Sequence, residues 1–157
     1  MSESVPLVIF RVEDQRYGLP LSMVERIVRA AEVTPLPKAP AIVIGVLDVE
    51  GRVLPVLNIR QRLGMPECKI SPAHQFVIAR TSKRGVVFVI DEALGVVALP
   101  STGIVGAAQI VPGLEHIRGV VQLPDGLVLI HDLERFLSLQ EERALDEALK
   151  EGVDHAH

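Results

Sequence analysis

The amino-acid sequence predicts a mainly β protein, and two observations carry this prediction. Short apolar runs rich in Val and Ile recur at close spacing with turn residues between them, which is typical of a barrel or a sandwich. Helical patterns are scarce until the C-terminal segment. The 157 residues suit one domain of ordinary size, or two small lobes that share a core.

The expected strands are separated by polar, Gly and Pro residues that favour chain reversal. Such turn signals lie at residues 13–15, at Glu50-Gly51 and at residues 124–126. Most strand pairings are therefore expected to be antiparallel. The strands are predicted near Leu7 to Val12, Gly45 to Val49, Arg52 to Leu57, Gln75 to Ala79, Gly85 to Ile90, Gly95 to Leu99, Gly119 to Leu123 and Leu127 to Ile130.

Two brief helices are predicted in the first half of the chain. Pro20 suits the first position of a helix, and the residues that follow it share a helical face, namely Leu21, Val24, Ile27 and Val28. Further on, Asn58 with Gln61 three residues later resembles a capping box. Gly64 and Pro66 are expected to end the second helix.

The C-terminal segment has the clearest helical pattern. Ser138 and Glu141 form another capping-box start. Leu145, Ala148 and Leu149 then give an apolar stripe before Gly152. The sequence predicts a helix at about 139–151 that packs on the β structure.

One sequence pattern occurs twice. GVLDVEGRVLPVLNI from Gly45 and GVVQLPDGLVLIHDL from Gly119 each contain a strand, a turn, a strand and an Asx residue that could cap a helix, 74 residues apart. Two similar lobes, fused without a linker, would explain the echo. The alternative is a pair of hairpins of similar composition.

Composition argues against nucleic-acid and membrane roles. The formal net charge is −4, aromatic residues make up 3% of the chain and Trp is absent, so a basic or base-stacking face is not expected. Every apolar run is broken before it could cross a bilayer, and the start of the sequence lacks a basic region. The single Cys68 excludes an internal disulfide. We therefore expect a cytoplasmic protein that neither binds nucleic acid nor inserts directly into a membrane.

Known catalytic and metal-binding spacings are missing from the sequence. The five His residues are scattered, apart from a pair at the tail, and no zinc-site, nucleophile-elbow or phosphate-loop pattern occurs. His131-Asp132 and Asp91-Glu92 are better explained by a helix cap and a turn than by acid–base catalysis. The sequence predicts no enzyme, no metal and no cofactor, which favours a protein-binding role. A small β-barrel for nucleic acid or a small ligand is the competing class.

Four blocks of the sequence resemble the CheW-like family of chemotaxis coupling proteins, over about Leu7 to Leu137. They are YGLPLSMVERIVR from Tyr17, TPLPKAPAIVIGVLDVEGRVLPVLNIRQRLG from Thr34, VVFVIDEALGVVALP from Val86 and GLEHIRGVVQLPDGLVLIHDLERFL from Gly113. The resemblance implies two fused five-stranded SH3-like β-barrels with short helices and a C-terminal helix. It implies a single domain over 1–157, with two intertwined lobes at about 7–137.

The resemblance also implies the role. Such a protein would be a non-catalytic adaptor that couples the cytoplasmic tips of methyl-accepting chemoreceptors to the regulatory domain of a CheA-type histidine kinase. It would work in the cytoplasm, at the inner membrane face through receptor arrays. The alternative is the same adaptor in a non-flagellar pathway that controls pili, surface behaviour or a second messenger.

The family pattern nominates site residues. Val24, Ile27, Glu50 and Arg60 are expected to bind partner proteins, although core packing is an alternative for Val24 and Ile27. A structural role is expected for Gly45, Gly51, Pro55 and Gly119. Where the family has Arg before the hairpin Gly, this chain has Glu50, and Val87 replaces a family Gly. We therefore expect a partner with a basic residue opposite Glu50, and Glu50→Arg should weaken its binding.

Overall fold

The structure is a computed structural model, and it describes all residues except 1–3, 101–104, 107–116, 124–125 and 155–157. The turn predicted at residues 124–126 lies largely outside the described residues. The described elements are β1 (Ser4–Val12), β2 (Gln15–Pro20), η1 (Leu21–Met23), β3 (Val24–Arg29), β4 (Val43–Val49), β5 (Arg52–Leu57), α1 (Ile59–Arg62), β6 (Gln75–Arg80), β7 (Gly85–Ile90), β8 (Glu92–Pro100), β9 (Val105–Gly106), β10 (Ile117–Leu123), β11 (Gly126–His131), η4 (Leu133–Arg135) and α2 (Leu139–Asp154).

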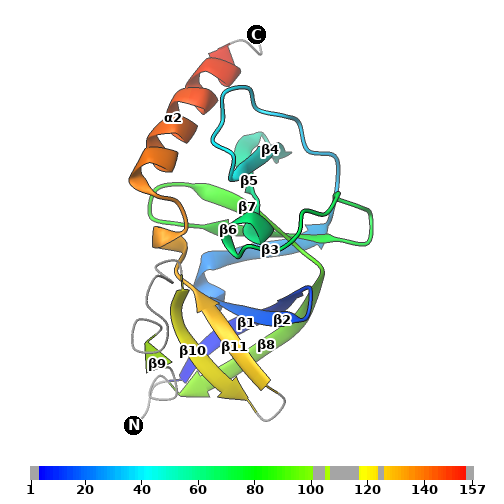
Figure 1. The fold of residues 1–157 in the computed structure, drawn as a ribbon, viewed down its shortest axis with the longest axis vertical. Coiled ribbons are helices and arrows are strands. Elements are labelled where there is room, and N and C mark those ends of the chain that lie inside the picture. The colour runs from blue at the N-terminus through cyan, green and yellow to red at the C-terminus, as the bar shows by residue number, and fades with distance from the viewer. Residues whose placement is uncertain (1–3, 101–104, 107–116, 124–125, 155–157) are drawn as a thin grey trace.

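The strands form two sheets, each the basis of one lobe (Figure 1). Lobe A has the strand order β8-β1-β2-β11-β10-β9, where β9 is only two residues long. Lobe B has the order β3-β6-β7-β5-β4. The predicted fold class, mainly β with two SH3-like lobes, is confirmed.

Between its described strands, the chain crosses from one lobe to the other twice. After β2 in lobe A, the chain passes through η1 into β3, which belongs to lobe B. After β7 in lobe B, it passes into β8, which belongs to lobe A. Each lobe therefore contains an edge strand that follows directly from the other lobe, and the two lobes are intertwined.

The strand register reveals an internal repeat. Ile9 faces Gly18 in the β1–β2 hairpin, and Ile78 faces Val87 in the β6–β7 hairpin, each 69 residues further on. Gly45 faces Val56 in β4–β5, and Gly119 faces Ile130 in β10–β11, each 74 residues further on. Both lobes also have one parallel pairing, of β5 with β7 and of β11 with β2, while the other pairings between described strands are antiparallel. The echo in the sequence thus corresponds to equivalent hairpins.

Three hydrophobic clusters make up the core. One fills lobe A around Ile9 and Val128, and another fills lobe B around Phe76 and Ile78. The third and largest lies between the lobes and includes Phe10. Alternate residues of β1 and β6 point to different clusters, because successive side chains of a strand face opposite sides of the sheet. The central strands are therefore apolar on both faces, and both lobes contribute to the interlobe cluster.

Two of the three predicted helices form, although α2 continues through Gly152, where it was expected to end, to Asp154. The Asn58 side chain accepts a hydrogen bond from the Gln61 N–H at the start of α1. At the start of α2, the Ser138 hydroxyl accepts from the Glu141 N–H, and the Glu141 carboxylate accepts from the Ser138 N–H. Figure 1 shows α2 lying along lobe B, although it follows the last strand of lobe A.

The helix predicted after Pro20 is wrong beyond Met23. Only η1 is helical, and Val24–Arg29 is strand β3, which pairs with β6. A register shift between Val24 and Arg26 leaves Glu25 as an extra residue on β3. Because of this extra residue, Val24 and Ile27 can both face the core although they are three positions apart, a spacing that is also typical of a helix.

Candidate functional site: two lobe surfaces and an interlobe polar cluster

An ion-paired surface is formed by β3 and the tip of the β4–β5 hairpin. Arg26 Nη2 lies 2.7 Å from Glu50 Oε1. Arg52 donates to both carboxylate oxygens of Glu25, at 3.2 and 2.7 Å. Because β3 is one edge of the lobe B sheet and the β4–β5 hairpin forms the other side, these pairs connect opposite sides of the sheet. We call Glu25, Arg26, Glu50 and Arg52 the charge quartet.

The quartet depends on two local backbone features. The bulge at Glu25 leaves both Glu25 and Arg26 exposed, where regular alternation would turn one of them inward. At the hairpin tip, Glu50 has φ 52 and Gly51 has φ 84, the left-handed pair of a type I′ turn. The Gly51 N–H also donates to Asp48 Oδ1 at 2.9 Å. Glu50 thus occupies a backbone conformation that Asn or Gly adopts more readily.

Electrostatics couples the members of the quartet. The hydrogen bond from Arg52 lowers the pKa of Glu25, and the hydrogen bond from Arg26 lowers the pKa of Glu50. Their side chains are exposed to different degrees, with Glu25 at 27%, Arg52 at 42%, Arg26 at 43% and Glu50 at 70%. The outermost charge of this surface is therefore a carboxylate.

Apolar residues border the quartet. Val24 and Ile27 are half-buried and pack against the interlobe cluster. Leu21, one turn before β3, is exposed. This rim of the interlobe core thus presents apolar and charged groups together.

Lobe A presents a different, apolar edge. On the edge strand β8, Leu94 is 44% exposed and Val96 is 57% exposed. Leu94 is itself an extra residue at a register shift, the counterpart of Glu25 in the repeat. Large exposed aliphatic side chains on an edge strand are a feature of protein-binding surfaces.

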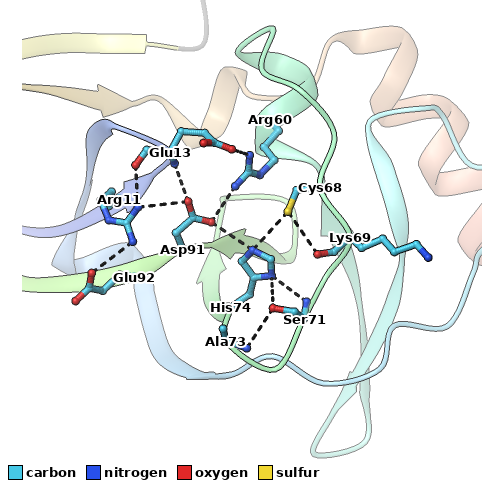
Figure 2. Close-up of polar contacts among 10 residues, drawn as sticks. All are labelled: Arg11, Glu13, Arg60, Cys68, Lys69, Ser71, Ala73, His74, Asp91 and Glu92. Carbon is cyan, nitrogen blue, oxygen red and sulfur yellow. Dashed lines mark hydrogen bonds and ion pairs between the residues drawn. The ribbon is translucent and has the colours of Figure 1, made fainter.

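A polar cluster joins the two lobes (Figure 2). Arg60 of α1 forms ion pairs with Glu13, in the β1–β2 turn, and with Asp91, in the link from β7 to β8, the latter at 2.9 Å. The Glu13 N–H donates to Asp91 Oδ2 at 2.7 Å. The Arg60 side chain is only 10% exposed. Arg60, expected to contact a partner protein, therefore lies inside the molecule and bridges the lobes.

The carboxylate of Asp91 is held in its ionised form. Burial alone would raise its pKa, but the hydrogen bond from the Glu13 N–H and the charge of Arg60 outweigh burial, and the pKa is lowered. His74 Nε2 lies 3.4 Å from Asp91 Oδ1. Asp91 thus accepts contacts from three separate chain segments.

Cys68 lies next to this cluster, with Sγ 3.9 Å from His74 Nε2. A cysteine nucleophile needs a histidine that holds the thiol at one ring nitrogen and a carboxylate at the other. Here both Cys68 and Asp91 approach Nε2, while Nδ1 accepts the Ser71 N–H at 2.9 Å. The arrangement in Figure 2 does not fit a nucleophilic triad.

A groove of about 700 Å³ opens beside the cluster. The segment after β3 and the loop after α1 form most of its walls, with Val33, Cys68 and Ile70, and Ile44 of β4 adds to them. Among the described residues, no three His, Cys, Asp or Glu side chains are grouped so as to hold a metal ion. Within the same residues, no helix is long and apolar enough to span a membrane.

Residues 6–141 match the family described as the CheW-like domain. The chain belongs to this family. Chemotaxis protein CheW of Treponema pallidum (strain Nichols) is 26% identical over 145 residues, which cover 88% of this chain and 85% of the relative. Protein FrzA of Myxococcus xanthus is 35% identical over 120 residues, covering 72% and 71%.

A solved structure has the same fold. The crystal structure of the scaffolding protein TtCheW from Thermoanaerobacter tengcongensis aligns with a TM-score of 0.79 and covers 90% of this chain and 96% of that chain. Its sequence is only 18% identical, so the likeness concerns the fold of the CheW-like chain.

The structural residues nominated from the sequence take identifiable places in the CheW-like fold. A Cβ on Gly45 would lie 2.3 Å from the Thr34 carbonyl oxygen, because Thr34 and Val46 exchange two backbone hydrogen bonds beside it. Pro55 faces Val46, whose N–H and C=O point to Thr34, so the missing N–H of Pro55 breaks no β4–β5 bond. Gly119 is buried in β10.

Sequence reasoning nominated Val24, Ile27 and Glu50 of this CheW-like chain as partner-binding residues without relating their positions. The structure brings them together on β3 and the adjoining hairpin tip. It missed Glu13 and Asp91 as partners of Arg60, and Arg26 as the partner of Glu50. These partners come from distant parts of the chain, and only the opposite charges could have suggested them.

Proposed function

We propose that this CheW-like chain is a non-catalytic adaptor that couples chemoreceptors to a CheA-type histidine kinase. The family match over residues 6–141 is the observation that carries the proposal. Two chemically different exposed surfaces, one on each lobe, give the chain a means of holding two different partners at once.

The receptor tip is proposed to dock at the rim of lobe B. Val24 and Ile27 there border the interlobe core, and the charge quartet lies beside them. A helix can set its apolar residues against such a rim and its polar residues against the charges. The lobe B rim suits a receptor helix better than the lobe A edge does, because its charged groups give a docked helix a defined register.

The kinase regulatory domain is proposed to dock on β8 of lobe A. Leu94 and Val96 are well exposed on this edge strand, although apolar side chains of this size are usually buried. Burial of such groups against a second β lobe is a normal source of association free energy. In this proposal the chain joins the kinase and the receptor in the cytoplasm and changes the kinase output by conformational transmission.

The non-catalytic part of the proposal is supported by the site geometry. The thiol of Cys68 and the carboxylate of Asp91 approach the same nitrogen of His74, so the imidazole cannot be oriented by one while it activates the other.

The second candidate function is that of an adaptor in a different signalling pathway. It is the same adaptor in a non-flagellar chemosensory system; one relative, with 35% identity, is named Protein FrzA rather than Chemotaxis protein CheW. Neighbouring genes distinguish the two, since flagellar genes favour chemotaxis and pilus or nucleotide-cyclase genes favour the alternative.

The test is a pull-down from lysate of the source cells with the purified chain, in which partners are identified by mass spectrometry. Recovery of a CheA-type kinase together with chemoreceptors supports the proposal. Val96→Asp should reduce recovery of the kinase, and Leu139→Asp, at an even more exposed position on α2, is the control. If a folded bait recovers neither kinase nor receptor from cells that express both, the proposal fails.

A further inference from the structure

The charge quartet is not required by the lobe architecture. The internal repeat places three described residues of lobe A at positions equivalent to Glu25, Arg26 and Arg52, namely Leu94, Gly95 and Gly126. None of these residues is charged, yet lobe A builds the same hairpins and the same register shift. The strands and hairpins of lobe B therefore do not need the charge quartet in order to form.

The quartet presents its charges in a definite order. Glu50, at 70% exposure, lies outside Arg26, at 43%, which bonds its Oε1 atom. In the second pair the order is reversed, because Arg52, at 42% exposure, lies outside Glu25, at 27%. A carboxylate can accept from two cations at once, one at each oxygen. A cationic side chain that approaches from solvent can thus join Glu50 without displacing Arg26.

Glu50 is also held in an unfavourable backbone conformation. Its φ of 52 is in the left-handed region, where Asn or Gly would be easier to accommodate at this turn. The hairpin could form with either of those residues. The carboxylate at this position therefore points to a role outside the turn itself.

We propose that the Arg26–Glu50 pair is a specificity determinant that selects a receptor helix with a Lys or Arg facing Glu50. This inference rests on the proposed function, and it adds the chemistry of the partner and the part of Arg26. Arg26 holds the Glu50 carboxylate in place before binding. The cation of the receptor helix then binds the second oxygen of the same carboxylate. A receptor with an acidic residue at that position is repelled by Glu50.

The experiment measures binding of the purified chain to the cytoplasmic fragment of the chemoreceptor encoded in the same genome. The variants are Glu50→Arg, Arg26→Glu and the double variant with both changes. The double variant restores an ion pair of opposite polarity, so its melting temperature should match that of the unchanged chain. Glu147→Arg, on an exposed position of α2, changes the net charge by the same amount as Glu50→Arg and serves as the control for that variant.

Glu50→Arg and the double variant should both bind the receptor fragment about tenfold more weakly than the unchanged chain. Glu147→Arg should bind normally. Receptor fragments in which single Lys or Arg residues of the tip are changed to Glu should include one that binds the double variant more tightly than it binds the unchanged chain.

The inference is overturned if the double variant, folded and stable, binds the receptor fragment as tightly as the unchanged chain. It is also overturned if Glu147→Arg weakens binding to the same extent, because the effect would then be one of net charge. In both cases binding by the unchanged chain leaves the proposed function standing. If the unchanged chain binds neither the receptor nor the kinase, the proposed function and the inference both fail.

Discussion

Arg60 and Asp91 form an ion pair 2.9 Å long at the junction of the two lobes. Arg60 follows the hairpin of lobe B, and Asp91 begins the link that takes the chain back into lobe A. Glu13, in the first turn of lobe A, completes the contact. Arg60, Asp91 and Glu13 therefore hold together the point at which the chain passes from β7 of lobe B to β8 of lobe A.

Replacement of Arg60 should destabilise the whole fold. Arg60→Met would leave Glu13 and Asp91 without their shared cation, and breaking a mostly buried pair costs about 3 kcal/mol. The free energy of unfolding, measured in urea by circular dichroism, should fall by that amount. The control is Arg135→Met, since Arg135 is 72% exposed and its contact to Asp132 is long, at 3.9 Å. Equal stability of the two variants would contradict the bridging role of Arg60.

The stabilising effect of Asp91 should depend on pH. Its pKa in the folded protein is lowered, so its contribution is fully present above the unfolded-state pKa of about 3.9 and is lost as pH falls through the folded-state value. The stability gap between the unchanged chain and Asp91→Asn should therefore be fully present at pH 5. Below about pH 4 the gap should shrink. Urea unfolding at a series of pH values measures it, and a gap that persists unchanged at pH 3 would rule out this linkage.

The sequence allowed the fold class and most strands to be predicted, because alternation and turn residues are local signals. Strand β3 was missed because the bulge at Glu25 disturbs the period of two, and its pairing with β6 depends on residues about fifty positions away. β-Branched Val24, Ile27 and Val28 were the residual local signal for a strand.

The site was only partly predictable for a related reason. Val24, Ile27 and Glu50 could be nominated from motifs near them in the sequence. Arg60 could not be recognised as internal, since a long cation is ordinarily exposed and its burial here depends on two carboxylates from remote segments. The pairing of Glu50 with Arg26 likewise required the edges of lobe B to be placed side by side.

Gly45 should be intolerant of a side chain. In Gly45→Ala the new Cβ would lie 2.3 Å from a backbone oxygen of Thr34, so the Thr34–Val46 bridge would have to open, at a cost of about 1–3 kcal/mol. Gly18→Ala is the matched control, because its Cβ would meet the side-chain ends of Ile9 and Val128 at 3.4 Å and the Val8 carbonyl oxygen only at 3.7 Å. Thermal unfolding of both variants checks the prediction. A larger loss for Gly18→Ala than for Gly45→Ala would show that the bridge is not the limiting contact.

Helix α2 should contribute to the stability of both lobes through one face. Leu145 has no exposed surface and belongs to the interlobe cluster, so Leu145→Ala should lower the free energy of unfolding by about 3 kcal/mol. Leu139, in the same helix, is 72% exposed, and Leu139→Ala should change stability little. On the polar side, Arg84 bonds Glu142 at 2.8 Å, which ties α2 to lobe B.

Because the interlobe cluster also contains residues of lobe A such as Phe10, the loss in Leu145→Ala should affect both lobes together. Native-state hydrogen exchange can test this, since it reports the opening of each strand separately. Amides of β1 in lobe A and β6 in lobe B should lose protection by similar amounts. Loss confined to β6 would mean that α2 stabilises lobe B alone and that the two lobes open independently.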